Sequence, residues 1–128
     1  MGQFRITPRR KHILAKIPDY AVTISPAGRR VTIACQDEVI AESDDALLVQ
    51  ETRHADVFYL PRADVNMALL SRTEHSTYCP FKGHASYWTL EVNGSKEENL
   101  AWSYENPDPE VAPLKDYLSF YTDRIRIR

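Results

Sequence analysis

The stretch Ser86-Tyr-Trp-Thr-Leu-Glu-Val-Asn-Gly-Ser-Lys-Glu-Glu-Asn-Leu-Ala-Trp-Ser-Tyr104 decides the fold of this 128-residue chain. Over residues 86–92, apolar side chains recur at every second position, which predicts a strand with one buried face. Asn93-Gly94 is a strong signal for a tight hairpin turn, because both residue types tolerate positive φ. The returning strand is predicted at 98–104, so an antiparallel hairpin lies at the centre of the predicted fold.

Further strand signals lie on both sides of this hairpin. Short alternating or apolar segments separated by turn residues predict strands at 21–24, 30–34, 38–41, 46–50 and 57–60. Residues 67–70 could form a helical turn or a strand. Apolar residues at helical spacing predict a helix at 110–121, with Pro113 in its first turn, and residues 124–128 predict an edge strand. The expected fold is therefore mainly β, with short antiparallel strands and a short C-terminal helix.

Length and composition indicate one globular domain. The chain is 43% hydrophobic and 27% charged, with a net charge of -2, which gives no support for a nucleic-acid partner. Residues 1–19 are expected to form a basic arm and residues 20–128 a single β-rich domain. No apolar run approaches the roughly 20 residues that span a bilayer, and no secretory signal is recognised. We expect a cytoplasmic protein whose two cysteines remain unpaired, with no membrane partner and no cofactor.

The chemically richest stretch directly precedes the hairpin and contains Cys79-Pro-Phe-Lys-Gly83. A cationic neighbour stabilises a thiolate, so Cys79 and Lys82 are candidate catalytic residues. Lys82 followed by Gly83 could instead hold a phosphate or carboxylate, with the glycine letting backbone N–H groups approach the anion. Two structural alternatives stay open: Cys79 as a small apolar core residue, and Lys82 as a surface residue at a turn.

Other candidate residues are spread along the chain. The candidate ligand-binding residues are Arg62, His84, Trp88, Glu98 and Trp102. Arg62 and Glu98 would orient a substrate and the tryptophans would cover it, although aromatic pairs on neighbouring strands more often form core. Histidines and glutamates, among them His54 and Glu51, could gather round a divalent ion, but their spacing matches no catalytic metal motif. No metal site is predicted.

Several segments, in one order, resemble the family known as domain of unknown function 427, sometimes labelled nucleotidyltransferase-like. The matching pieces are Glu38-Val-Ile-Ala-Glu-Ser43, Glu51-Thr-x-His54, Tyr59-x-Pro61-Arg62-x-Asp64-Val65, Cys79-Pro-Phe-Lys-Gly83 with Ala85-Ser86-Tyr87, Glu98-Asn99-x-Ala101-Trp102-Ser-Tyr104, Pro109-Glu110-Val111 and Lys115-Asp-Tyr117-x-x-Phe120-Tyr121. The resemblance implies a β-tent fold similar to that of methionine sulfoxide reductase B, without the paired cysteines that hold zinc there. It implies little about activity. The chain departs from the family pattern at His84, where an Asp is expected after Lys-Gly.

Three functions follow from these residues. The first is an enzyme that binds a small anionic, for example nucleotide-like, ligand around the Cys79–Gly83 loop and carries out group transfer. The second is a binding module that uses the same pocket without catalysis. The third is a structural or oligomerising domain with Cys79 in its core, and exposed edge strands are compatible with a homodimer. A ligand-binding pocket is the preferred interpretation, and catalysis stays open.

Overall fold

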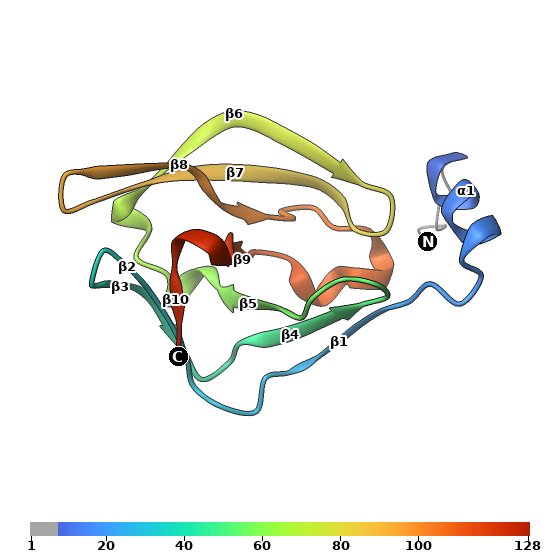
Figure 1. The fold of residues 1–128 in the computed structure, drawn as a ribbon, viewed down its shortest axis with the longest axis horizontal. Coiled ribbons are helices and arrows are strands. Elements are labelled where there is room, and N and C mark those ends of the chain that lie inside the picture. The colour runs from blue at the N-terminus through green and yellow to red at the C-terminus, as the bar shows by residue number, and fades with distance from the viewer. Residues whose placement is uncertain (1–7) are drawn as a thin grey trace.

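A computed structural model describes residues 8–128 and shows a mainly β chain with two antiparallel sheets (Figure 1). A single α-helix, α1, precedes the strands in this part of the chain and spans Pro8–Lys16. The strands are β1 (Val22–Pro26), β2 (Val31–Cys35), β3 (Glu38–Ser43), β4 (Leu47–Glu51), β5 (Val57–Pro61), β6 (Leu70–Cys79), β7 (Gly83–Val92), β8 (Ser95–Ser103), β9 (Tyr117–Phe120) and β10 (Arg126–Ile127). Short 3₁₀-helices lie at Arg62–Asp64, Met67–Leu69, Pro109–Leu114 and Thr122–Arg124. The mainly β prediction is confirmed.

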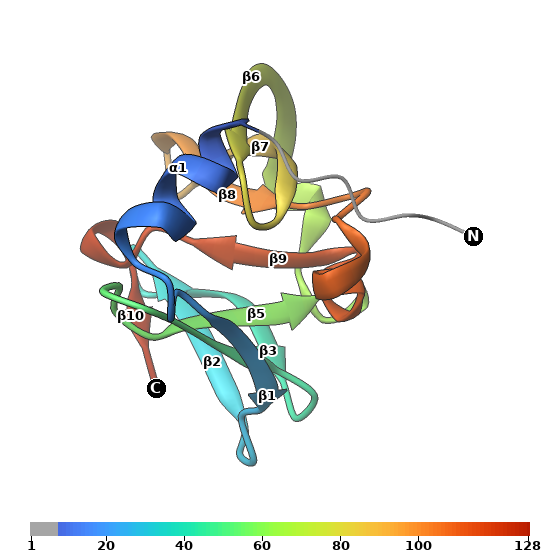
Figure 2. The ribbon, with the colours of Figure 1, turned by 90° about the vertical axis from the view of Figure 1, so that its right-hand side faces the viewer.

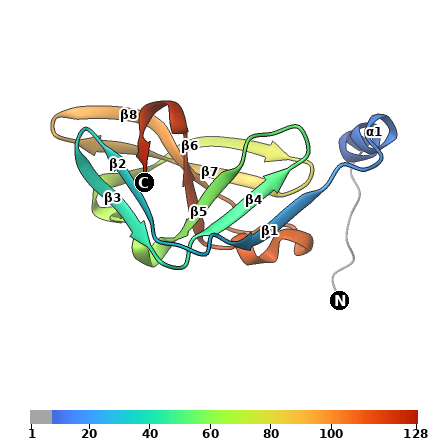
Figure 3. The same ribbon diagram turned by 60° about the horizontal axis from the view of Figure 1, so that its bottom comes forward.

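The larger sheet has seven strands in the order β1-β4-β5-β9-β8-β7-β6. It curves strongly, so that β6, β7 and β8 run along one side of the molecule and β5, β4 and β1 along the other, with β9 between them (Figures 1 and 2). The smaller sheet, β10-β2-β3, lies at one end of this arrangement (Figure 3). The turns β4–β5 and β6–β7 lie at the opposite end, on the side where α1 is found (Figure 1).

The central strand β7 separates two hydrophobic clusters. Trp88, Leu90 and Val92 point into the first cluster, which the small sheet helps to cover. Ala85 and Tyr87 point into the second cluster, together with residues of β4, β5 and the 3₁₀-helix at Pro109–Leu114. The buried face therefore changes along β7: it carries Ala85 and Tyr87 near the start of the strand and Trp88, Leu90 and Val92 further on. The prediction of one buried face holds for residues 88–92, and the burial of Tyr87 on the other face is the correction to it.

The predicted helix at 110–121 is wrong beyond Leu114. A 3₁₀-helix at Pro109–Leu114 contains a second proline, and Asp116 then has a φ of 60°, which reverses the chain. The following residues form β9, which pairs with both β5 and β8. Leu118 in this strand is completely buried. The helix-like spacing of Leu114 and Leu118 therefore arises from two separate elements, and the two leucines pack into different clusters, Leu114 into the second and Leu118 into the first.

Two regular elements were not predicted as such. β6 pairs along β7 with a register shift between Arg72 and Ser76, and most of its side chains are exposed. The helix α1 replaces part of the predicted basic arm, whose residues 1–7 lie outside the described residues. Within the described part of the chain, no helix is both long and apolar enough to cross a membrane.

Candidate functional site

A cavity of about 270 Å³ lies against the second hydrophobic cluster, at the end of the molecule where the β4–β5 and β6–β7 turns meet. Its wall is made by residues from five strands of the larger sheet (β4 to β8) and from both turns. The side chains that carry polar or aromatic chemistry are Glu51, His54, Tyr59, Cys79, Lys82, Tyr87, Trp102, Tyr104 and Tyr121. The curvature of the sheet thus brings together residues from distant parts of the sequence.

The Cys79–Gly83 loop is the tight turn between β6 and β7, and it directs Lys82 into the molecule. The Lys82 N–H donates to the Cys79 carbonyl at 3.2 Å, and the Lys82 carbonyl accepts from the Asp108 N–H at 2.9 Å. Gly83 has a φ of 110°, a conformation that side chains with a Cβ rarely adopt. The lysine is consequently only 6% exposed, and the alternative of a surface Lys82 is wrong.

Lys82 forms a buried ion pair with Glu51, and their side chains are 8% and 12% exposed. A buried charge is tolerated when it is paired and hydrogen-bonded, which accounts for a lysine at this position. The Lys82 Nζ also lies 3.9 Å from the Sγ of Cys79, and the Tyr20 hydroxyl donates to the second oxygen of Glu51. The Nε2 of His54 lies 3.9 Å from that same oxygen. A thiol, an ammonium group and a carboxylate thus meet at one end of the cavity.

Tyrosine and tryptophan side chains form the remaining wall. The Trp102 Nε1 donates to the Tyr59 hydroxyl at 3.1 Å, and the Tyr59 and Tyr104 ring centroids are 6.5 Å apart. Burial raises the pKa of both tyrosines above the ordinary value. Burial, together with a hydrogen bond to Tyr87, raises the pKa of Tyr121 to about 12. These hydroxyls therefore stay protonated at neutral pH and can donate hydrogen bonds.

Three of the predicted site residues, Cys79, Lys82 and Trp102, line this cavity. The structure does not bring Arg62, His84, Trp88 or Glu98 to it. Trp88 is 2% exposed and belongs to the first hydrophobic cluster, on the other face of β7 from Tyr87. The guanidinium of Arg62 lies 5.5 Å from the centroid of the Trp88 ring, so this pair is a packing contact at a different surface.

The other two predicted residues lie at the periphery. His84 is exposed at the start of β7, and its ring centroid lies 5.0 Å from that of Tyr78. Glu98 is exposed on β8, and its carbonyl accepts a hydrogen bond from Arg124 at 2.9 Å. The Asp expected after Lys-Gly in the resemblance would stand at the position of His84, outside the cavity.

Sequence reasoning did not assign Glu51, Tyr59 and Tyr20 to this site. Glu51 and Tyr59 stand within the quoted family segments, which is the signal that could have drawn attention to them. Glu51 is 31 residues from both Tyr20 and Lys82 in the sequence. Only the pairing of β1 with β4 and the curvature of the sheet bring these three side chains together.

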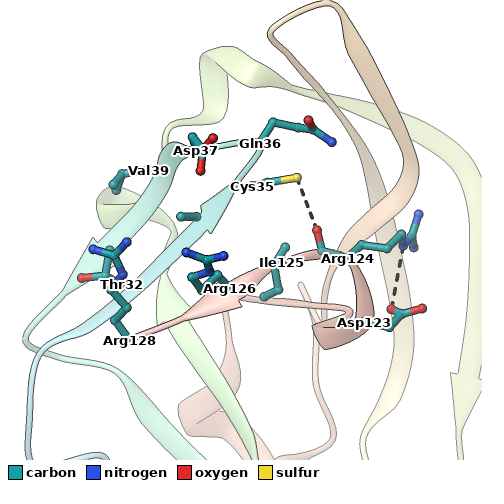
Figure 4. Close-up of a pocket in the computed structure, with 11 residues that line it drawn as sticks. Thr32, Cys35, Gln36, Asp37, Val39, Asp123, Arg124, Ile125, Arg126 and Arg128 are labelled. Carbon is teal, nitrogen blue, oxygen red and sulfur yellow. Dashed lines mark hydrogen bonds and ion pairs between the residues drawn. The ribbon is translucent and has the colours of Figure 1, made fainter.

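A larger hollow of about 460 Å³ lies elsewhere, between the β2–β3 turn and the C-terminal segment (Figure 4). It contains the other thiol, Cys35, which donates to the Arg124 carbonyl at 3.4 Å. Burial raises the pKa of Cys35, which disfavours its reactive thiolate. Arg124 itself forms an ion pair with Glu97, with 3.6 Å between the guanidinium Nη1 and the carboxylate Oε1. We therefore place the candidate site in the smaller cavity, where the reactive groups converge.

The fold and the cavity define a small, mainly β domain in which a free thiol adjoins a buried lysine–glutamate pair and an aromatic wall. Among residues 8–128, no group of three or more His, Cys, Asp or Glu side chains lies close enough together to hold a metal ion.

Residues 23–128 match the family described as Domain of unknown function (DUF427), and the chain belongs to this family. The family predicted from the sequence segments is thereby confirmed. A comparison with curated proteins finds none that matches this chain.

Proposed function

We propose that the protein binds a small, flat molecule with an oxyanion group in the cavity beside Cys79 and Lys82. The observation that carries this proposal is the combination of one buried ammonium group with protonated tyrosine hydroxyls on an aromatic wall. Pockets of this kind orient a ligand through a few polar groups, while the apolar lining supplies contact area. The expectation of a small anionic ligand from the sequence is retained in this form.

Two tyrosine hydroxyls support the choice of an oxyanion. The Tyr59 hydroxyl accepts a hydrogen bond from Trp102, so its own proton is available for donation. The Tyr104 hydroxyl also lines the cavity, and no hydrogen-bond partner for it is found within the described part of the chain. The two residues are 2% and 7% exposed, so each donor would act in an environment with limited access to water. A carboxylate or phosphate oxygen would satisfy both donors.

The volume limits the size of the ligand. At about 270 Å³, the cavity is at or just below the range of roughly 300–1,000 Å³ that is typical of sites for drug-sized ligands. An aromatic carboxylate would fit inside, whereas a nucleotide would place only one end there. The free thiols of Cys35 and Cys79 fit a reducing compartment, so we retain the expectation of a cytoplasmic protein.

Isothermal titration calorimetry with benzoate as the probe tests this function. Replacing Tyr104 by phenylalanine should raise the dissociation constant for benzoate about tenfold, since a hydrogen bond to a charged group contributes roughly 1.5 kcal/mol. The matched control is Tyr117→Phe, because Tyr117 packs against the same cluster without lining the cavity. Uncharged benzamide should bind more weakly than benzoate. Equal affinities for the two probes, or an unchanged constant in the Tyr104 variant, would contradict the proposal.

Catalysis is a second candidate function, and the position of Cys79 favours it. The thiol is partly accessible, lines the cavity and lies 3.9 Å from the Lys82 ammonium nitrogen. A cysteine acts as the nucleophile in group transfer through its sulfur, and the ammonium group lies close enough to this sulfur to attract an anionic substrate towards it. A non-catalytic binding module would require no reactivity at Cys79.

The rate of alkylation of Cys79 by iodoacetamide distinguishes these two functions. In a Cys35→Ser background, replacing Lys82 by methionine and Glu51 by glutamine together should slow the reaction about three- to tenfold, because the ammonium charge is lost. The double replacement avoids leaving one buried charge without its partner. Lys96→Met, a change at an exposed pair with Glu91, should leave the rate unchanged. A thiol that reacts only after unfolding would favour the binding or structural alternatives.

A further inference from the structure

We propose that Tyr20 determines the charge specificity of this cavity by holding the Glu51 carboxylate away from the bound oxyanion. This inference rests on the proposed function and adds the residue that makes the cavity accept an anion despite the carboxylate in its wall. Tyr20 and α1 precede the residues that match the family, which begin at residue 23. The specificity would therefore come from a segment outside the matched domain.

The contacts of the Glu51 carboxylate explain why it needs a second donor. One oxygen accepts from the Lys82 ammonium group, and the other accepts from the Tyr20 hydroxyl. Burial, the hydrogen bond to Glu51 and the negative charge of Glu51 all raise the pKa of Tyr20, so that its hydroxyl remains a donor. Without this donor, the second oxygen would keep His54, whose Nε2 lies 3.9 Å away, as a more distant polar neighbour, and its negative charge at the cavity wall would repel an incoming anion more strongly.

Tyr20 is fixed in place by the loop that carries the reactive residues. Its ring stacks on Phe81, with centroids 4.3 Å apart and an interplanar angle of 24°. Phe81 is buried and lies between Cys79 and Lys82 in the turn. The position of the Tyr20 hydroxyl is thus coupled to the same turn that places the thiol and the ammonium group.

The helix α1 completes this support from outside. Its Arg10 guanidinium lies 4.7 Å from the centroid of the Phe81 ring and forms an ion pair with Glu110 at 2.6 Å. Arg10 is 8% exposed, so the helix is docked rather than solvated at this point. Figure 2 shows α1 beside the β6–β7 turn and next to the start of β1. Arg10 and Tyr20 therefore both pack against the Phe81 ring, and this contact joins α1 and the segment leading into β1 to the β6–β7 turn.

The relative rates of two alkylating reagents at Cys79 test the role of Tyr20. The same thiolate attacks the iodine-bearing carbon of iodoacetate and of iodoacetamide, forming a C–S bond as iodide leaves. The two reagents differ in charge, so the ratio of their rates reports the potential at the sulfur independently of how much thiolate is present. In a Cys35→Ser background, Tyr20→Phe keeps the stack on Phe81 but removes the hydroxyl. The ratio of the iodoacetate rate to the iodoacetamide rate should fall about threefold, as expected for one unscreened charge several ångströms away. Tyr117→Phe should leave the ratio unchanged.

A double-mutant cycle separates this effect from a structural one. Glu51→Gln should raise the rate ratio, and adding Tyr20→Phe to that variant should produce no further change, because the carboxylate that Tyr20 holds is gone. An unchanged ratio in the Tyr20→Phe variant, or the same fall in both backgrounds, would overturn the proposal. The ratio is measurable whether or not benzoate binds, so failure of the proposed function and failure of this inference give different results.

Discussion

Replacing Lys82 by methionine is expected to lower the free energy of unfolding by about 3 kcal/mol, because it leaves the Glu51 carboxylate largely buried without its cation. The Lys82 side chain is 8% exposed and the Glu51 side chain 12% exposed, so water can compensate for the loss only in part. The Tyr20 hydroxyl still donates to Glu51, which places the effect at the lower end of values for broken buried pairs. Urea unfolding at neutral pH, followed by tryptophan fluorescence, measures this difference.

Two comparisons identify the cause of the destabilisation. The variant Lys82→Met with Glu51→Gln should recover most of the loss, since neither partner then carries a buried charge. Lys96→Met should change the free energy of unfolding by less than about 0.5 kcal/mol, because an exposed pair contributes little. If Lys82→Met were no more destabilising than Lys96→Met, the buried pair would not be the stabilising interaction that its geometry indicates.

The central hairpin could be predicted because its signals are local. Alternation along β7 and the Asn93-Gly94 turn need no knowledge of the rest of the chain, and both are present in the structure. Asn99 lies in β8 with a φ of 52°, and the pairing shifts register between Trp88 and Leu90. Such an irregularity depends on what packs against each face of the sheet, so alternation alone does not place it.

The elements that were missed lack a local signal or carry a misleading one. β6 is an edge strand of the larger sheet whose side chains are mostly exposed, so its sequence shows no hydrophobic period. β9 lies between two other strands and has only four residues, of which Leu118, Ser119 and Phe120 are buried. Leu118 continues the spacing of Val111 and Leu114 in the preceding 3₁₀-helix, which is why a single helix fitted the pattern.

The candidate site likewise contains residues that the sequence could predict and residues that only the fold brings together. Cys79 and Lys82 could be predicted because they share one turn, and the nature of that turn explains how both face inward. Glu51 reaches the site only through the pairing of β1 with β4 and of β4 with β5. Trp88 and Tyr87 are consecutive aromatic residues of one strand, so their side chains lie on opposite faces of β7. The sequence does not show which face borders the cavity, and the predicted site contained Trp88, whereas the structure places Tyr87 there.

Above about pH 10, the free energy of unfolding is expected to fall steeply, because Tyr59 and Tyr104 resist ionisation in the folded protein. Burial is the main cause that raises the pKa of each in the folded state, while the unfolded chain has the ordinary value of about 10. Between these values the unfolded state loses protons that the folded state keeps. Stability is therefore fully present below about pH 10 and is lost as the pH rises, at about 1.4 kcal/mol per pH unit for each tyrosine.

The contribution of one tyrosine can be isolated by comparing unfolding free energies of the wild type and Tyr104→Phe from about pH 9 to about pH 11. Phenylalanine cannot ionise in either state, so the decline between these two pH values should be smaller in the variant by about 1.4 kcal/mol in total. Lysines and the remaining tyrosines titrate in both proteins, and their effects cancel in the difference. Parallel curves would mean that Tyr104 ionises as readily in the folded protein as in the unfolded chain. Its hydroxyl would then lie in water, and the water-free oxyanion site would lose one of its two tyrosine donors.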